Sequence, residues 1–176
     1  MQEVFRANDT LLGRQVAVKR AKNASADRRF KRSAVLSARV NHPNVAKTLD
    51  YVEEGSQAYL VEEFIDGFDL SRLLEEHMVA LDPDLVARLL HHIVKGVSAS
   101  HAQGVVHRDL KPSNVMISGG LAILNAKVTD FGIAKMAEEE ITREVEGGNA
   151  TMTTSKTVVG AIPYMAPEAI ETPREV

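Results

Sequence analysis

Three side chains with complementary chemistry lie close together in the middle of the chain. A carboxylate, an ammonium group and a carboxamide stand at Asp109, Lys111 and Asn114. The carboxylate could accept a proton from an alcohol, and the ammonium group could neutralise charge on a phosphoryl group during transfer. The amide oxygen is a hard ligand that suits Mg²⁺. The spacing therefore predicts a site for phosphoryl chemistry on this turn.

The elements around this turn are suited to hold it rigidly. Apolar residues 105–106 enter the turn and apolar residues 115–117 leave it, so two strand-like flanks fix the spacing of its side chains. Upstream, Asp82 and Pro83 are typical of the N-cap and first residue of a long helix, which Gly104 ends. We expect one face of that helix to be buried, at Leu85, Leu89, Ile93, Val97 and His101.

The N-terminal part of the chain alternates short β-type runs with turns. We expect strands at residues 3–7 and 15–19, a helix at residues 27–40, and a hairpin of residues 45–52 and 57–64. A break at Asp66-Gly67 precedes a short helix at residues 70–77. The predicted fold class is α+β with two lobes, a strand-rich lobe at residues 1–65 and a helical lobe at residues 66–176.

Composition excludes several classes of protein. The chain has 176 residues, of which 44% are hydrophobic and 26% charged, which is typical of one globular domain. Its net charge of −3 gives no attraction to nucleic acid, and no apolar run is long enough to span a membrane. There is no cysteine and no signal-peptide pattern. We therefore expect a cytoplasmic protein with no nucleic-acid partner and no membrane segment in this chain.

Four motifs together carry a resemblance to a known family. They are Val16-Ala17-Val18-Lys19, the turn at residues 107–114, Asp130-Phe131-Gly132 and Ala166-Pro167-Glu168. In their order and spacing the chain resembles the eukaryotic-type (Hanks-type) serine/threonine protein kinases, whose catalytic loop has the pattern His-Arg-Asp-Leu-x-x-x-Asn. The overall pattern is most similar to bacterial members. The resemblance implies a two-lobed, protein-kinase-like fold.

The resemblance also implies roles for individual residues. Asp109, Lys111 and Asn114 would be catalytic, and Asn114 and Asp130 would bind Mg²⁺. Lys19 would bind the phosphates of ATP. Lys111 favours serine or threonine over tyrosine in protein substrates. The expected adenosine site consists of the backbone of Glu63 and Ile65, the side chain of Asp69 at the ribose, and Val4, Ala17 and Met116 around the adenine ring.

Two of these assignments have structural alternatives. Asp69 precedes Leu70, so it could instead be the N-cap of the short helix. Val4, Ala17 and Met116 would have the same appearance in the sequence if they were ordinary core residues.

The long segment between Gly132 and Ala166 contains a cluster of hydroxyl groups. We expect phosphorylation at Thr153, Ser155 or Thr157, including phosphorylation by the kinase itself. A phosphate there could pair with Arg108. The alternative is a polar loop that is not modified.

The chain departs from the family pattern at both ends. Gln2 falls where the last glycine of the glycine-rich loop belongs, so we expect Met1 to be an internal residue of a longer reading frame. The helices that follow Glu168 in the family do not follow it here. We therefore expect a kinase domain truncated at both ends, with an incomplete C-terminal lobe.

Two further departures concern the catalytic machinery. Ser33 falls where the family places the glutamate that pairs with the lysine, and Glu62 just before the hinge is the candidate replacement partner of Lys19. The alternative is that Glu62 and Glu63 both face solvent. Ala161 replaces the usual threonine near the catalytic loop, which we expect to slow transfer.

Two functions follow from these observations. The first is an enzyme that transfers the γ-phosphoryl group of ATP to serine or threonine of proteins in signalling, with Mg²⁺ as cofactor. The second is a catalytically impaired, pseudokinase-like module that binds nucleotide or protein, or an inactive fragment. The intact Lys19, Asp109 and Asp130 favour the first function, whereas Ser33 and Ala161 favour the second.

Overall fold

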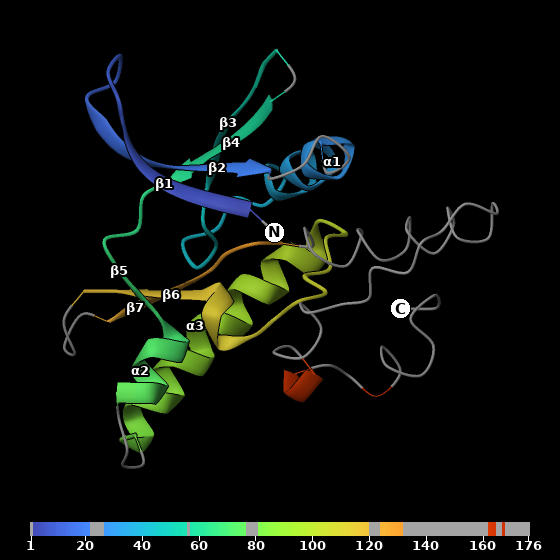
Figure 1. Ribbon diagram of the computed structural model, residues 1–176. Helices are drawn as coiled ribbons and strands as arrows, with labels where there is room; N and C mark the ends of the chain where they lie inside the picture. Colours follow the sequence, from blue (N-terminus) through green and yellow to red (C-terminus); the bar gives the residue numbers. More distant parts are fainter. Residues whose placement is uncertain are drawn as a thin grey trace.

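Residues 2–63 form a four-stranded antiparallel sheet with one helix beside it (Figure 1). The computed structural model describes residues 2–21, 27–55, 57–76, 81–119, 124–131, 162–164 and 167. The strand order is β1-β2-β4-β3. We call this unit the N-lobe; its elements are β1 (Gln2–Asp9), β2 (Arg14–Ala21), α1 (Asp27–Ser37), β3 (Thr48–Glu54) and β4 (Gln57–Glu63).

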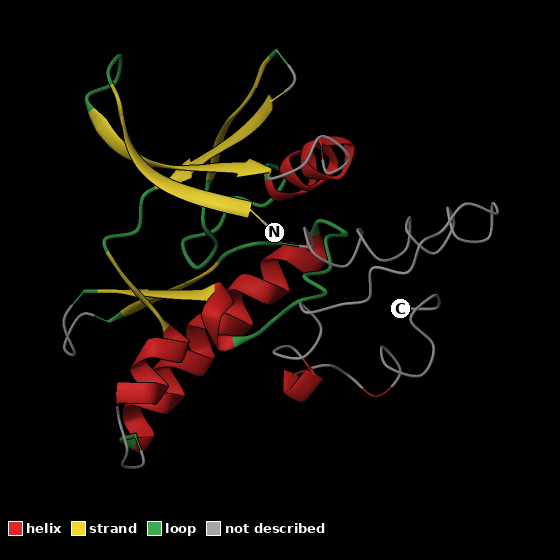
Figure 2. Ribbon diagram, in the orientation of Figure 1, coloured by secondary structure: helices red, strands yellow, loops and turns green. Residues whose placement is uncertain are grey.

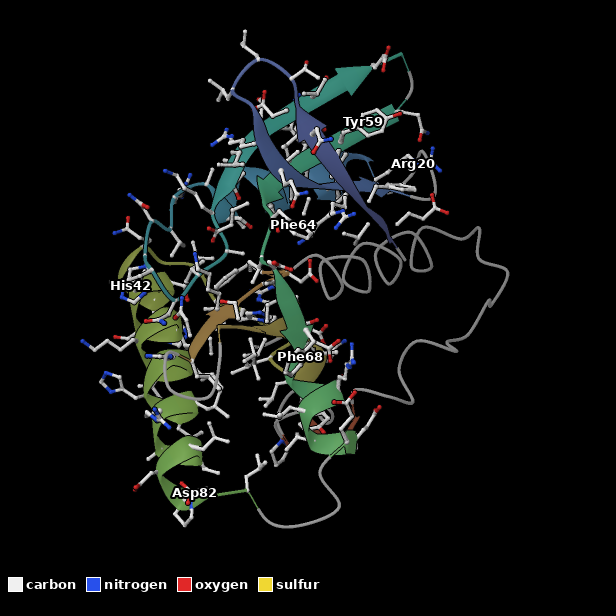
Figure 3. The ribbon with its side chains drawn as sticks, turned by 90° about the vertical axis from the view of Figure 1, so that its left-hand side faces the viewer. Arg20, His42, Tyr59, Phe64, Phe68 and Asp82 are labelled. Atoms are coloured by element: carbon white, nitrogen blue, oxygen red, sulfur yellow. The ribbon has the colours of Figure 1, made fainter. Side chains whose placement is uncertain are left out.

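A smaller antiparallel sheet and two α-helices form the second unit, the C-lobe (Figure 2). Figure 3 shows Phe64 below the N-lobe sheet and Phe68 in the first strand of the C-lobe, so the chain passes between the lobes there. This is the two-lobed α+β fold that the sequence predicts. The elements are β5 (Gly67–Asp69), α2 (Leu70–Glu76), α3 (Pro83–Ala102), η2 (Pro112–Asn114), β6 (Val115–Ser118), β7 (Asn125–Val128) and η4 (Ile162–Tyr164).

Strands β1 and β2 form where the sequence predicts strands, and they pair as an antiparallel hairpin. Its turn is stabilised by Asp9, whose carboxylate accepts hydrogen bonds from the backbone N–H groups of Leu11 and Leu12. Gly13 closes the turn with a φ of 64°, a conformation that costs glycine little.

Helix α1 is shorter than predicted, and it buries one apolar face. It ends at Ser37, after which single turns continue to Val40 ahead of Pro43. Phe30 and Ala34 are each 2% exposed and pack on Ala58 and Leu60 of β4. The helix is therefore held against the N-lobe sheet by its apolar face.

The prediction that the β3 hairpin starts at Val45 is wrong. Residues 44–46 instead bond to β7 of the C-lobe: Ala46 N–H donates to the Val128 carbonyl and Val128 N–H donates to the Asn44 carbonyl, each at 2.9 Å. The Asn44 side chain also donates to the Ala126 carbonyl at 2.9 Å. Strand β3 therefore begins only at Thr48, because the preceding backbone has its partners in the other lobe.

Helix α3 has the predicted start. The Asp82 carboxylate accepts from the backbone N–H groups of Asp84 and Leu85, and Pro83 occupies the first turn. Figure 3 shows Asp82 at one end of the helix and His42 beside the other end. On its outward side Leu90 and Val94 are exposed.

The expected burial of His101 is wrong. Leu85 and Leu89 are buried as predicted, but near the C-terminal end the buried positions are Gly96 and Ser100, and His101 is exposed. A spacing of four residues drifts by about 40° per step around a helix of 3.6 residues per turn. After four steps from Leu85, position 101 has therefore rotated away from the core.

A hydrophobic cluster joins the two lobes. Val40 and Val45 from the N-terminal half meet Val105, Val128 and Phe131, and all five are at most 3% exposed.

In the described part of the chain no helix is both long and apolar enough to cross a membrane.

The close approach between α3 and residues 44–46 generates a stability prediction. A Cβ atom at Gly96 would lie 2.4 Å from the Asn44 carbonyl oxygen, so Gly96→Ala must displace backbone. We expect it to lower the free energy of unfolding by about 1–3 kcal/mol, because overpacking outweighs a helix-propensity gain of about 1 kcal/mol. Urea denaturation of the variant and the wild type measures the change in the free energy of unfolding. Ser98→Ala, at an exposed position of α3, should be neutral or slightly stabilising; equal effects of the two variants would contradict the prediction.

His107 generates a second prediction, on pH. The ring is 3% exposed, its Nε2 donates to the Thr129 carbonyl at 2.8 Å, and its Nδ1 accepts from Asp109 N–H at 3.3 Å. Both bonds suit the neutral ring, and burial lowers the pKa of His107 from the ordinary value of 6.5. Between that value and the lower folded-state pKa the unfolded chain binds more protons, so stability falls as pH drops from 7 towards 5.

The measurement is the free energy of unfolding as a function of pH for the wild type and His107→Gln. The variant should be less stable at pH 7 but should lose less stability on acidification, by up to about 1.4 kcal/mol per pH unit. Burial also lowers the pKa of His92, so some slope remains in the variant. Parallel curves for the two proteins would show that His107 does not titrate on unfolding in this range.

Candidate active site

The polar turn at residues 107–114 is anchored at both ends in buried structure. Val105 lies in the interlobe cluster, and η2 leads directly into the buried Val115 of β6. Within the turn Arg108 has a φ of 63°, a left-handed conformation that is rare for a bulky side chain. The turn is therefore held in one shape by its flanks.

Asp109 is oriented by two neighbours. Lys111 Nζ donates to Asp109 Oδ2 at 2.7 Å, and Asn114 Nδ2 donates to the same oxygen at 3.1 Å. Asn114 Nδ2 also donates to the Asp109 backbone carbonyl at 2.8 Å. Among the described residues neither a donor to Asp109 Oδ1 nor one to Asn114 Oδ1 is found, so both oxygens remain for other ligands.

The Asn114 amide is suited to a divalent cation. Its two acceptors are both oxygens, which fixes the nitrogen towards Asp109 and leaves the side-chain oxygen as the possible ligand atom. Asp130 follows Thr129, whose backbone N–H donates to the Asn114 carbonyl at 2.9 Å. An amide oxygen and a carboxylate that are tied together in this way fit Mg²⁺, which takes few protein ligands and completes its shell with phosphate and water.

Lys19 connects this turn to the N-lobe. It is 5% exposed, and its Nζ lies 2.5 Å from Glu62 Oε2 and 2.7 Å from Asp130 Oδ1. Burial by itself lowers the pKa of Lys19, but the two carboxylates outweigh this and raise it, so the lysine is charged. Burial raises the pKa of Glu62, with Lys19 acting in the opposite direction. We treat the pair as ionic because of its short contact with a charged lysine.

Glu62 and Glu63 have different surroundings, and neither simply faces solvent. Glu62 is 5% exposed. Glu63 accepts from Lys127 Nζ at 2.6 and 2.8 Å and from Lys47 N–H at 2.9 Å. Lys127 and Lys47 are not among the site residues that the sequence predicts, because no pattern near either lysine indicates Glu63.

Two of the expected adenosine residues share the sheet face of Lys19 in the N-lobe, and a third lies on β6 of the C-lobe. Val4 is opposite Lys19 in the register of β1 and β2, and Ala17 is opposite Glu62 in that of β2 and β4, so both share the face of Lys19. Met116 is opposite Asp69 in the register of β5 and β6, on the side of β6 away from the buried Val115 and Ile117. Val4 is 57% exposed, and Met116 and Ile65 are half-buried.

Asp69 has the alternative role of helix cap. Its Oδ1 accepts from the Ser71 hydroxyl and from Arg72 N–H, the latter at 3.1 Å, which is an N-cap arrangement at the start of α2. Contact with a ribose remains a prediction. Outside the described residues lie Thr153, Ser155, Thr157, Ala161 and Glu168, together with the side chains of Gln2 and Ser33.

Comparison with known proteins agrees with this geometry. The protein kinase domain family matches residues 1–175. A probable serine/threonine-protein kinase of Streptomyces coelicolor is 37% identical over 96% of the chain, and serine/threonine-protein kinase PrkC of Bacillus subtilis is 32% identical over 96% of it. In each case the chain spans only 24% of the relative's length.

A solved structure shares the fold. The kinase domain of PknI from Mycobacterium tuberculosis superimposes with a TM-score of 0.64 at 25% identity, covering 76% of this chain and 56% of that one. Family match, relatives and fold therefore agree, and the chain belongs to the protein kinase domain family, with relatives among the bacterial Hanks-type serine/threonine kinases.

Proposed function

We propose that this chain carries the nucleotide site and catalytic centre of a cytoplasmic protein kinase that phosphorylates serine or threonine of protein substrates, including itself. The observation that supports this most is the single connected set of contacts from Lys19 through Asp130 and Thr129 to Asn114 and Asp109. A polar set of this kind, built from both lobes, matches the needs of phosphoryl transfer.

In this proposal Asp109 Oδ1 orients the substrate hydroxyl and accepts its proton. The hydroxyl oxygen forms a bond to the γ-phosphorus of ATP while the bond from that phosphorus to the bridging oxygen of ADP breaks. Lys111, held 2.7 Å from Asp109, stabilises the charge on the transferring group. Asn114 Oδ1 and Asp130 would hold Mg²⁺, which would supply positive charge to neutralise the phosphates.

Lys19 and the connection between the lobes would bind ATP. An ammonium group has three donors, and the described contacts of Lys19 use two of them, which leaves one for a phosphate oxygen. The backbone of Glu63 and Ile65 would pair with the adenine edge, with Val4, Ala17 and Met116 against the ring and Asp69 near the ribose. The two lobes in this proposal are residues 1–65 and 66–176, and Thr153, Ser155 or Thr157 would receive regulatory phosphates.

The test is transfer of labelled phosphate from ATP to a generic protein substrate, with the chain alone and in its full reading frame. Asp109→Asn should lower the transfer rate by about 10²–10⁴-fold, because the proton acceptor is lost, while ATP binding and the thermal unfolding midpoint are kept. Asp84→Asn, an exposed carboxylate at the start of α3, is the matched control and should leave transfer unchanged.

Two results would contradict the proposal. Equal rates for Asp109→Asn and the wild type would remove Asp109 from the mechanism. An absence of transfer from both forms of the wild type, with ATP still bound, would select the pseudokinase-like binding module.

A further inference from the structure

The pairing of Lys19 with Glu62 is set by the register of two neighbouring strands. In the antiparallel pair of β2 and β4, Lys19 is opposite Leu60 and Ala17 is opposite Glu62. Lys19 and Glu62 are therefore diagonal neighbours on one face of the sheet, a separation that long side chains can bridge. Strand pairing therefore places the two side chains within reach of each other, and they meet at 2.5 Å.

Both members of this pair are buried, which gives the contact consequences that a surface ion pair lacks. Each side chain is 6% exposed, whereas the Asp130 side chain is 26% exposed. Without the Glu62 charge, the ammonium group would pair with Asp130 alone. Lys19 would then be drawn towards Asp130, where its ammonium group would be less available to phosphate and would compete with Mg²⁺ for the carboxylate.

Helix α1 contributes apolar packing to this region and almost no negative charge. Its only acidic residue is Asp27, at its first position, and the charged residues that follow are basic. Phe30 and Ala34 pack on Leu60, the residue directly opposite Lys19. The described contacts of Lys19 come from β4 and from Asp130, and none comes from α1.

We propose that Glu62 is the positioning residue for Lys19, so that the lysine is aligned by the register of the N-lobe sheet and independently of the position of α1. This inference rests on the proposed function, because it assigns Lys19 to the phosphates of ATP. Within that function it names the strand β4, instead of a helix, as the source of the aligning carboxylate.

Three variants in the full reading frame test the proposal, with transfer kinetics and the affinity for a fluorescent ATP analogue as readouts. Glu62→Gln keeps the shape of the side chain but removes its charge; we expect kcat/KM for ATP to fall about 10²-fold and nucleotide affinity to fall about tenfold. Glu62→Asp keeps the charge and should retain most of kcat/KM for ATP and most of the nucleotide affinity. Thermal unfolding checks that each variant is folded.

The third variant is a matched control that loosens α1. Glu53 on β3 is exposed and accepts from Lys31 of α1 at 3.0 Å, so Glu53→Gln removes a carboxylate and a tether of the helix together. If alignment of Lys19 is independent of α1, both readouts should stay within about twofold of the wild type, as for an exposed pair.

The outcomes separate this inference from the proposed function. If the wild type transfers phosphate and Glu62→Gln is equally active, the inference is wrong but the proposed function is not contradicted. The same holds if Glu62→Asp is as impaired as Glu62→Gln. A loss in Glu53→Gln matching that in Glu62→Gln would overturn the independence from α1. If the wild type binds the analogue without transfer, the function fails and the affinity of Glu62→Gln decides the inference. A wild type that binds no nucleotide overturns both.

Discussion

The two backbone hydrogen bonds between residues 44–46 and β7 determine much of the rest of the structure. They attach a segment from the N-terminal half to the strand that ends just before Asp130. Val45 and Val128 stand beside these bonds in a cluster that excludes water, so the attachment is stabilised by burial as well. Lys19 meets Asp130 across the lobes because this attachment sets the distance between the N-lobe sheet and β7.

Two ion pairs with opposite polarity cross between the lobes. In one the cation Lys19 comes from the N-lobe and the anion Asp130 from the C-lobe; in the other the anion Glu63 comes from the N-lobe and the cation Lys127 from the C-lobe. A sliding of one lobe against the other along the line between the two pairs would separate both pairs and would bring one set of like charges nearer to each other. Because these groups are partly or fully buried, that repulsion would be screened less than at the surface. The pairs therefore favour one relative placement of the lobes.

The sequence allowed the prediction of features that depend on local chemistry. The capping of α3 by Asp82 and Pro83, and the strands β1 and β2 with the turn between them, depend on residues that are near one another in the chain. The pairing of Glu62 with Lys19 could also be predicted, although the two are 43 positions apart. The reason is that the family resemblance showed a missing carboxylate in the helix that normally provides it.

Features that depend on distant partners could not be predicted in the same way. Val45 begins the run of residues 45–52 that has the pattern of a strand, and only β7 explains why residues 44–46 lie outside the N-lobe sheet. The contact of Lys127 with Glu63 spans 64 positions, and nothing near either residue indicates the other. His101 fitted a repeat of four residues, but the rotation of a real helix accumulates over such a distance. In each case contacts between distant parts of the chain, or the geometry of a whole helix, determined a feature that the local sequence pattern did not.

The left-handed backbone at Arg108 and Asp130 has a consequence for how this site can change by mutation. Both φ angles lie near 60°, where aspartate is tolerated and a long side chain such as arginine is disfavoured. Replacement of Arg108 by asparagine would relax the chain locally and at the same time remove a guanidinium group beside Asp109. Selection for stability alone and selection for chemistry therefore act in opposite directions at this position. If selection for catalysis were lost, we expect substitutions to be accepted first at the positions where the backbone is most strained.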